Sequence, residues 1–216
     1  MLGKIKGYVK HNLVIPPNEQ GHEQRFKIGH AGTLDPLATG LLVICTGKMT
    51  KSIDSLQAGK KEYTGSIRFG QTTPSFDLET EPEGSYPTSH LSLEGIQKSA
   101  DTLSGHQMQT PPGYSAKQIG GQRAYKAARR GEKVDIPAVP IQVDAFEIIS
   151  FENNEATFRI ECSKGTYIRS LANDLGLRSN SGAYLSSLRR TESNPFNIKD
   201  AWSVEELLNR LNEVSI

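Results

Sequence analysis

The residues best suited to chemistry lie in a glycine-rich stretch, 29–40, which reads GHAGTLDPLATG. It contains a single carboxylate, Asp35, with Leu34 and Leu37 close on either side. Pro36 favours an extended backbone at Asp35, because the proline ring crowds the residue before it. The three glycines of the stretch allow tight turns and close approach of other groups. A carboxylate held rigidly between apolar neighbours is suited to act as a nucleophile or a general base.

The same dipeptide also has a purely structural interpretation. Asp-Pro is a common helix start, with Asp35 as the N-cap and Pro36 at the first helical position. The two interpretations are compatible, since a capped turn can still present a reactive side chain. The residues alone therefore leave open whether Asp35 caps a helix, performs chemistry, or does both.

Arg169 is the second unusual residue. It falls in the first turn of a helix expected over 166–177, where a cation opposes the helix dipole. The positions three and four residues later are Ala172 and Asn173, so no acid on the same helix can pair with it. Either Arg169 pairs with a carboxylate elsewhere in the chain, or it is an exposed arginine without a partner.

These residues belong to a longer series of motifs. The stretch 29–40 resembles the catalytic loop of the TruB-type tRNA pseudouridine synthases, and the similarity runs from about Lys27 to about Arg190. Further matches follow in the family's order: Lys61-Glu62-Tyr63, Pro111-Pro112-Gly113-Tyr114-Ser115-Ala116, Cys162-Ser163-Lys164-Gly165-Thr166-Tyr167-Ile168-Arg169, and Gly182 through Arg190.

The resemblance implies a reaction, a substrate and a set of partners. Enzymes of this family detach a uracil from its ribose, turn it, and rejoin it through carbon, usually at uridine 55 in the T arm of tRNA. They need no cofactor and no metal. A base inside a folded RNA arm must be flipped out of its stack, which costs a few kcal/mol. We therefore expect tRNA as the partner of a monomeric, cytoplasmic isomerase.

The resemblance also assigns the chemical roles. Asp35 is implied to be the essential carboxylate, adding either to the ribose or to the uracil ring. Arg169 is implied to pair with Asp35 and to keep it ionised, since an opposite charge within about 4–6 Å lowers a carboxyl pKa by roughly 1–3 units.

The remaining roles that the resemblance implies are contacts with the substrate. Tyr63 and Tyr167 would border the uracil, where stacking on an aromatic ring contributes about 1–3 kcal/mol per base. Leu188 would close the apolar wall. His30 would fill the space left by the flipped nucleotide, whereas an ordinary exposed loop histidine is the interpretation from the residues alone.

The hydrophobic pattern predicts the elements that must position these residues. Period-two alternation over 60–69 places Tyr63, Ile67 and Phe69 on one face of a strand. Helices are expected over 5–13, 50–56, 92–103, 125–130 and 166–177, with a last helix after the capping box of Ser203 and Glu206; strands are expected over 41–45, 60–69, 140–151 and 156–162; loops are expected over 16–21 and 152–155. This order predicts an α+β fold, a mixed and largely antiparallel sheet flanked by helices, as in the pseudouridine synthase fold.

The two ends of the chain differ from the family's pattern. The strand and the Lys-Pro-x-Gly-x-Thr-Ser signature that precede the first helix in the family have no counterpart here, so we expect an N-terminal strand to be missing. The 26 residues after Arg190, 191–216, are too few for the small RNA-binding PUA domain that many relatives carry. We expect one catalytic domain over 1–216.

The charge and the cysteine content of the chain limit the classes of protein to which it can belong. The chain has 25 Lys and Arg residues and 24 Asp and Glu residues, so its overall charge does not by itself indicate nucleic-acid binding. Cys45 and Cys162 lie in apolar or alternating runs and are expected to be buried, reduced thiols, and no apolar run is long enough to cross a membrane. Basic residues cluster locally, either as a phosphate contact or as a solvated helix face, at Lys117, Arg123, Lys126, Arg129, Arg130 and Lys133. An acidic stretch contains Asp77, Glu79, Glu81 and Glu83.

Two other functions compete with the isomerase. A non-catalytic RNA-binding module or RNA-folding chaperone would use the basic cluster, but it has no use for a carboxylate in the 29–40 loop, where the charge would repel phosphate. A carboxylate hydrolase such as a glycosidase would need a second acid in a similarly rigid setting. No such second acid is expected from the sequence.

Overall fold

The computed structural model describes residues 2–12, 20, 26–115, 117–119, 121–130, 132 and 135–214. Of the segments predicted from the sequence, Leu13 of the first helix, all of the 16–21 loop except Gln20, and Lys133 of the basic cluster lie outside the described residues.

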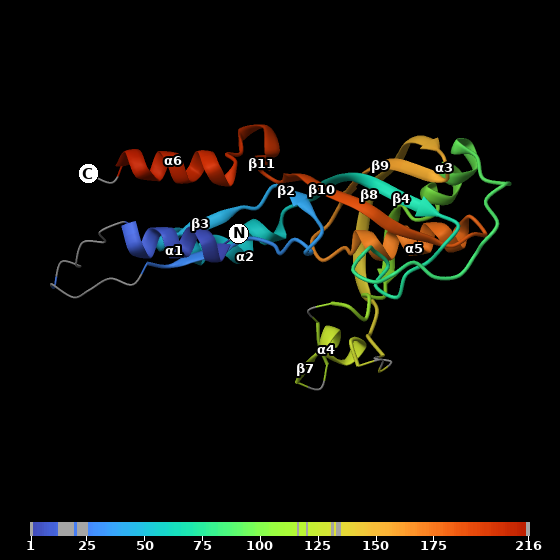
Figure 1. Cartoon of the computed structure of the whole chain (residues 1–216), viewed down its shortest axis with the longest axis horizontal. Helices are drawn as coiled ribbons and strands as arrows, with labels where there is room; N and C mark the ends of the chain where they lie inside the picture. The colour runs from blue at the N-terminus through green and yellow to red at the C-terminus, as the bar shows by residue number, and fades with distance from the viewer. Residues whose placement is uncertain are drawn as a thin grey trace.

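A seven-stranded sheet forms the centre of the described part of the chain (Figure 1). Its strands lie in the order β11 (Phe196–Asn197), β10 (Ala183–Ser193), β4 (Lys61–Phe69), β9 (Glu155–Cys162), β8 (Val139–Glu152) and β5 (Gly105–Gln109), and β2 (Thr39–Gly40) also pairs with β10. All neighbouring strands are antiparallel except β2, which runs parallel to β10. The predicted mixed, largely antiparallel sheet is therefore confirmed.

Two helices, α3 (Leu93–Asp101) and α5 (Ile168–Arg178), cover one face of this sheet and contact each other. The strands turn alternate side chains toward these helices, because successive residues of a strand point to opposite faces. The side chains of Ala156, Phe158, Ile160 and Cys162 on strand β9 are completely buried. The predicted turn between β8 and β9 is also present, with Asn153 and Asn154 at positive φ.

A second group of elements lies at the left of Figure 1, beyond strands β10 and β2. It comprises α1 (Leu2–Asn12), the strand pair β1 (Ile28–His30) and β3 (Ile44–Thr46), the 3-10 helix η1 (Gly47–Ser52), α2 (Ile53–Ala58), the 3-10 turn η2 (Ile198–Asp200) and α6 (Val204–Val214). Helix α1 contacts α6, and the predicted capping box is confirmed at Ser203 and Glu206, whose side chains each accept the other's backbone N–H. The strand predicted over 41–45 is shorter and begins only at Ile44.

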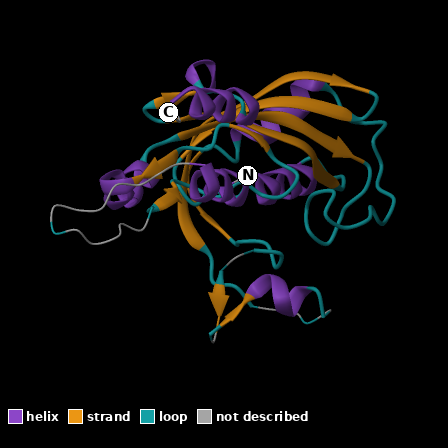
Figure 2. Cartoon of the chain, turned by 60° about the vertical axis from the view of Figure 1, so that its left-hand side comes forward, coloured by secondary structure: helices purple, strands orange, loops and turns teal. Residues whose placement is uncertain are grey.

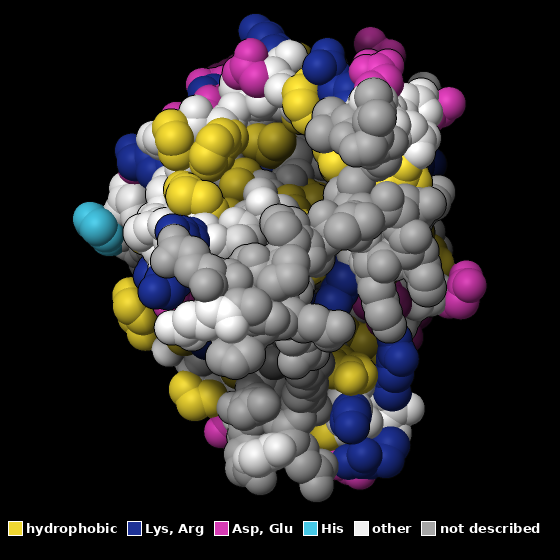
Figure 3. All heavy atoms as spheres, turned by 90° about the vertical axis from the view of Figure 1, so that its left-hand side faces the viewer, with side chains coloured by type: hydrophobic (Ala, Val, Ile, Leu, Met, Phe, Trp, Pro, Cys, Tyr) yellow, Lys and Arg dark blue, Asp and Glu magenta, His cyan; other side chains and the backbone are white. Residues whose placement is uncertain are grey.

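A small insert projects from the sheet between β5 and β8 and is seen most clearly at the bottom of Figure 2. It holds β6 (Gln118–Ile119), β7 (Gln122–Arg123) and α4 (Ala124–Ala128). Helix α4 corresponds to the basic helix predicted over 125–130, which is confirmed in a shortened form. In Figure 3, Lys and Arg side chains gather at the lower end of the face, at the level of this insert, while hydrophobic side chains gather toward the upper end.

The two cysteines have the predicted state. Cys45 and Cys162 are free and buried, and burial raises the pKa of the Cys162 thiol to about 12. Among the described residues, no helix combines the length and apolar character needed to cross a membrane.

Candidate active site

A cleft of about 840 Å³ opens where α5 begins, on the helix-covered side of the sheet. This volume lies within the range of small-molecule and cofactor sites. The 32–36 loop, the start of β4, part of β10, the loop before α5 and the insert all contribute to its walls. Five residues singled out in the sequence line the cleft together: Asp35, Tyr63, Tyr167, Arg169 and Leu188.

The loop that carries Asp35 does not form a helix. After Asp35 the chain makes a turn, in which the backbone N–H of Ala38 donates to the Asp35 carbonyl oxygen at 3.0 Å, and then enters β2. Pro36 occupies the second position of this turn, where its fixed φ is favourable. The helix-cap interpretation of Asp35 is therefore wrong, because residues 39–40 pair with β10 instead of continuing a helix.

Asp35 contacts Arg169 from the first turn of α5. The Arg169 Nη2 donates to Asp35 Oδ1 at 3.1 Å, and Nε lies 3.1 Å from Oδ2. The side chain of Arg169 is only 3% exposed, whereas that of Asp35 is 35% exposed. Arg169 is thus neither exposed nor without a partner, and its carboxylate comes from a loop 134 residues earlier in the chain.

A second carboxylate, Asp77, faces the same arginine. Asp77 is buried, and its Oδ2 lies 3.8 Å from Arg169 Nη1. Its Oδ1 accepts the backbone N–H of Glu79 at 2.9 Å. The guanidinium of Arg169 therefore lies between two acids, of which only Asp35 was expected from the sequence.

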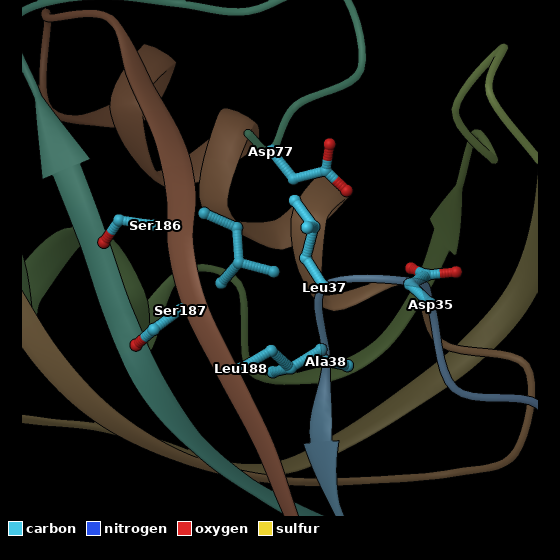
Figure 4. Close-up of a pocket in the computed structure, with 8 residues that line it drawn as sticks. Asp35, Leu37, Ala38, Asp77, Ser186, Ser187 and Leu188 are labelled. Carbon is cyan, nitrogen blue, oxygen red and sulfur yellow. The ribbon is translucent and has the colours of Figure 1, made fainter. Parts of the chain in front are cut away.

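Figure 4 shows a small pocket that Asp35 and Asp77 both line, with both carboxylates on the same side of β10 and Leu37 between Asp77 and Ala38. The pocket holds about 20 Å³, enough for one water molecule. The statement that no second acid lies in a rigid setting is thus wrong. Phe76 and Leu78 flank Asp77 as leucines flank Asp35, and this signal was available in the sequence.

Burial, rather than the arginine, determines the direction of the Asp35 pKa. Burial raises the pKa of this carboxyl above its ordinary value of 3.8, and the charges of Asp77 and Glu79 raise it further. Arg169 opposes these effects but does not outweigh them. The sequence-based expectation that the pKa is lowered is therefore wrong in its net direction, because the carboxylate loses hydration as well as gaining a partner.

Two tyrosines border the cleft near Asp35. Tyr63 lies in β4 and burial raises the pKa of its hydroxyl. Tyr167 precedes α5 and is half-buried. The amide of Gln109 holds the Tyr167 backbone at both ends, accepting its N–H at 2.8 Å and donating to its carbonyl at 3.1 Å. These two hydrogen bonds fix the backbone just before α5, and therefore the point on the helix from which the Arg169 side chain extends.

His30 is placed apart from the other predicted residues. It ends β1, where it pairs with Ile44, and it is not among the residues that line the cleft. Its Nδ1 is buried and has no hydrogen-bond partner in the part of the chain that the structure describes. Its proposed role beside a flipped nucleotide stays a prediction.

The basic cluster is divided between the cleft and solvent. Lys117 and Arg129 line the cleft, and Arg129 Nη2 lies 2.8 Å from Glu79 Oε1. Arg130 pairs with Glu132 at 2.7 Å on the surface of the insert. The side chain of Arg123 lies outside the described residues, as does Lys133. Within the described ranges, no group of three or more His, Cys, Asp or Glu side chains is placed to hold a metal ion.

The fold and the site together define a class of protein: a mixed sheet with an aspartate–arginine pair in a cleft bordered by tyrosines. The model of the TruB family pseudouridylate synthase N-terminal domain matches residues 20–168. The model of the tRNA pseudouridylate synthase B C-terminal domain matches residues 169–214. The chain belongs to the TruB family of pseudouridine synthases.

Individual relatives agree with this family. The chain is 50% identical over 184 residues to the tRNA pseudouridine synthase B of Flavobacterium johnsoniae, covering 85% of this chain and 80% of that protein. It is 45% identical to the protein of the same name from Phocaeicola vulgatus, covering 89% of this chain and 82% of the relative. Among solved structures, it resembles a chain in a Cbf5-Nop10-Gar1 complex with a TM-score of 0.67 and 25% identity. That match covers 96% of this chain and 49% of the solved one, so the chain spans about half the length of this neighbour.

Proposed function

We propose that this protein isomerises uridine to pseudouridine in the T arm of tRNA, with uridine 55 as its target. The names of its relatives support tRNA as the substrate. The observation that carries the proposal is the buried Arg169 beside a partly exposed Asp35 in a cleft bordered by Tyr63 and Tyr167.

Asp35 is the proposed catalytic carboxylate. Its 35% exposure lets it reach a substrate, while the contacts with Arg169 fix its direction. It acts in its ionised form, adding to the ribose or to the uracil ring while the bond between them breaks. The detached uracil turns within the cleft and is rejoined to the ribose through C5. The C5 hydrogen leaves as a proton, N1 gains a proton, and the bond to Asp35 breaks. Arg169 is the proposed positioning residue for this carboxylate.

The other predicted residues have binding roles in this proposal. Tyr63 and Tyr167 border the uracil, Leu188 supplies apolar surface beside it, and His30 occupies the place of the flipped nucleotide. Lys117 and Arg129, which line the cleft from the insert, contact RNA phosphates.

Incubation of unmodified tRNA with the protein, followed by cyanoethylation with acrylonitrile and mass spectrometry of nuclease fragments, tests the proposal. The cyanoethyl group is needed because pseudouridine has the same mass as uridine, and it adds preferentially to the N1–H of pseudouridine. We expect pseudouridine at position 55 and no change at other uridines. A fully unmodified T arm that the protein nevertheless binds would contradict the proposal and favour the non-catalytic RNA-binding alternative, which the basic insert also supports.

A further inference from the structure

Arg190 is a buried cation with an unusual set of partners. It lies in β10, lines the cleft and is only 1% exposed. Buried charged side chains are normally paired with an opposite charge, because desolvation of an isolated ion is costly. In the described part of the chain, no carboxylate forms an ion pair with Arg190, and its Nε and Nη2 donate instead to backbone carbonyl oxygens.

The two carbonyls lie at opposite ends of the loop that carries Asp35. The Nη2 of Arg190 donates to the carbonyl of Gly32 at 3.1 Å, and its Nε donates to the carbonyl of Leu41 at 2.8 Å. A single guanidinium thus joins the residue three positions before Asp35 to the residue six positions after it. An arginine suits this task, because its planar donors point in fixed directions that one ammonium group cannot reproduce.

The backbone of Arg190 holds the same loop a second time. The N–H of Leu41 donates to the Arg190 carbonyl at 2.8 Å, and Gly40 lies opposite Arg190 in the β2–β10 pairing. A Cβ at Gly40 would collide with the Arg190 carbonyl oxygen, and Gly40 has φ +98°, so only glycine fits this approach. The far end of the loop is therefore fixed to β10 at one residue.

Arg190 also has Tyr63 as its cross-strand neighbour. The two residues are directly opposite in the β4–β10 pairing, which brings their Cβ atoms to about 4.5–5.5 Å. The register between these strands shifts just after Arg190, and such bulges next to active sites redirect side chains. Burial raises the pKa of the Tyr63 hydroxyl, and the positive charge of Arg190 opposes this effect.

We infer that Arg190 is a positioning residue for the reaction: it clamps both ends of the Asp35 loop and holds Tyr63 beside it. The inference rests on the proposed function, since it assigns Arg190 a task in the same site. Arg190 contacts no reacting atom in this account. It acts through the position of Asp35 and Tyr63, so its loss should lower the chemical rate more than RNA affinity.

Three variants test this role. Arg190→Met removes the clamp, Arg190→Lys keeps the charge but not the fork of donors, and Arg190→Ala leaves room for an added guanidinium ion. Arg189→Met is the matched control, because it removes one positive charge from the adjacent, exposed position of the same strand. The measurements are the single-turnover rate of tritium release from tRNA labelled at uracil C5, the Kd for that tRNA, and hydrogen–deuterium exchange of the 32–41 amides.

A misplacement of about 1 Å in a catalytic group can lower the rate about 10²-fold. We expect a loss of this size in Arg190→Met, with little change in Kd and faster exchange over 32–41. Arg190→Lys should be intermediate, and guanidinium at millimolar concentration should restore part of the rate of Arg190→Ala. Arg189→Met should keep the wild-type rate and exchange pattern.

The outcomes separate this inference from the proposed function. If the wild type releases no tritium, the proposed function fails, while loop exchange in Arg190→Met still tests the clamp. If the wild type is active and Arg190→Met has a wild-type rate and wild-type exchange, the inference is overturned. Should Arg190→Met fail to fold, Arg190→Lys decides: slowed turnover with intact affinity supports the clamp, and unchanged turnover contradicts it.

Discussion

Arg159 and Arg169 lie on opposite sides of the same sheet, and each contacts more than one carboxylate. Arg159 is one-third exposed on the face without helices, with Glu62 at 2.7 Å, Glu147 at 3.1 Å and Glu161 at 3.7 Å. Arg169 is 3% exposed in the cleft, with Asp35 at 3.1 Å and Asp77 at 3.8 Å. Each arginine is thus surrounded by carboxylates, but Arg159 is partly exposed to solvent whereas Arg169 is buried.

The carboxylates respond in opposite directions. On the outer face, the Thr191 hydroxyl and Arg159 together lower the pKa of Glu62 despite some burial. In the cleft, burial raises the pKa of Asp35 despite Arg169. An arginine beside an acid therefore does not by itself fix the sign of a pKa shift, because desolvation competes with the ion pair. The pKa of the carboxyl in the cleft therefore lies above its ordinary value, whereas the pKa of the carboxyl on the outer face lies below its ordinary value.

Of the changes at and around the two arginines, Arg169→Met should have the largest effect on the rate. The change leaves Asp35 and Asp77 facing each other without the cation between them, so Asp35 loses its direction and its proton is held more firmly. We expect the single-turnover rate to fall at least about 10²-fold, as for other misplaced catalytic groups. Tritium release and tRNA affinity measured on the same preparation check this. A rate near that of the wild type would show that the buried pair is not needed.

Asp77→Asn should change the pH dependence of the reaction rather than abolish it. The charge of Asp77 contributes to the raised pKa of Asp35. Since turnover requires ionised Asp35, the rate should rise with pH through that pKa, and the midpoint should move to lower pH in Asp77→Asn. Glu81→Gln, at an exposed position of the same acidic stretch, is the control and should leave the midpoint in place. An unshifted midpoint in Asp77→Asn would contradict the coupling of the two acids.

Asp35 should also cost the protein stability at neutral pH. A carboxyl whose pKa is higher in the folded than in the unfolded state stabilises the fold below the unfolded value, and this contribution is lost as pH rises through the folded value. Asp35→Asn should therefore have a higher Tm than the wild type near pH 7, and the difference should shrink as pH falls toward the ordinary aspartate pKa of 3.8. Thermal melts across this pH range check the sign. A lower Tm for Asp35→Asn at pH 7 would mean that the ion pair outweighs burial.

The smallest effect should follow from Arg159→Met on the outer face. Partly exposed ion pairs contribute about 0–1 kcal/mol each, so the free energy of unfolding should change little and the rate of tritium release not at all. Denaturant unfolding and the turnover assay measure both. A rate loss comparable to that of Arg169→Met would remove the distinction between the two faces.

Many of the strands and helices that position the site were predictable, because local sequence patterns determine them. The alternation in 60–69 correctly placed Ile67 and Phe69 on the buried face of a strand. The absence of a local acid correctly limited Arg169 to a non-local partner or none, and the structure has the non-local partner. The shape of the Asp35 loop was not predictable in this way. Whether residues 39–40 continue a helix or pair with β10 depends on residues 189–190, which lie 150 positions later in the chain.

The same limit explains the residues that were missed. Asp77 has apolar neighbours in the sequence as Asp35 has, but it belongs to an acidic stretch that is typical of a solvated loop. The packing of that loop beside β10 buries it. The direction of the Asp35 pKa depends on how much solvent the assembled cleft excludes, which no motif contains. Long-range pairing and burial depend on how the whole chain folds. A sequence motif shows only which residues are present and how they are spaced.

The most direct test of the central claim is Asp35→Asn in the turnover assay. Asparagine keeps the shape of the side chain but removes its charge and nucleophilicity. We expect tritium release from uracil C5-labelled tRNA to fall to background while filter binding shows that the tRNA still binds, slightly more tightly because one negative charge near phosphate is gone. Tritium release at the wild-type rate in Asp35→Asn would contradict the assignment of this carboxylate as the catalytic group.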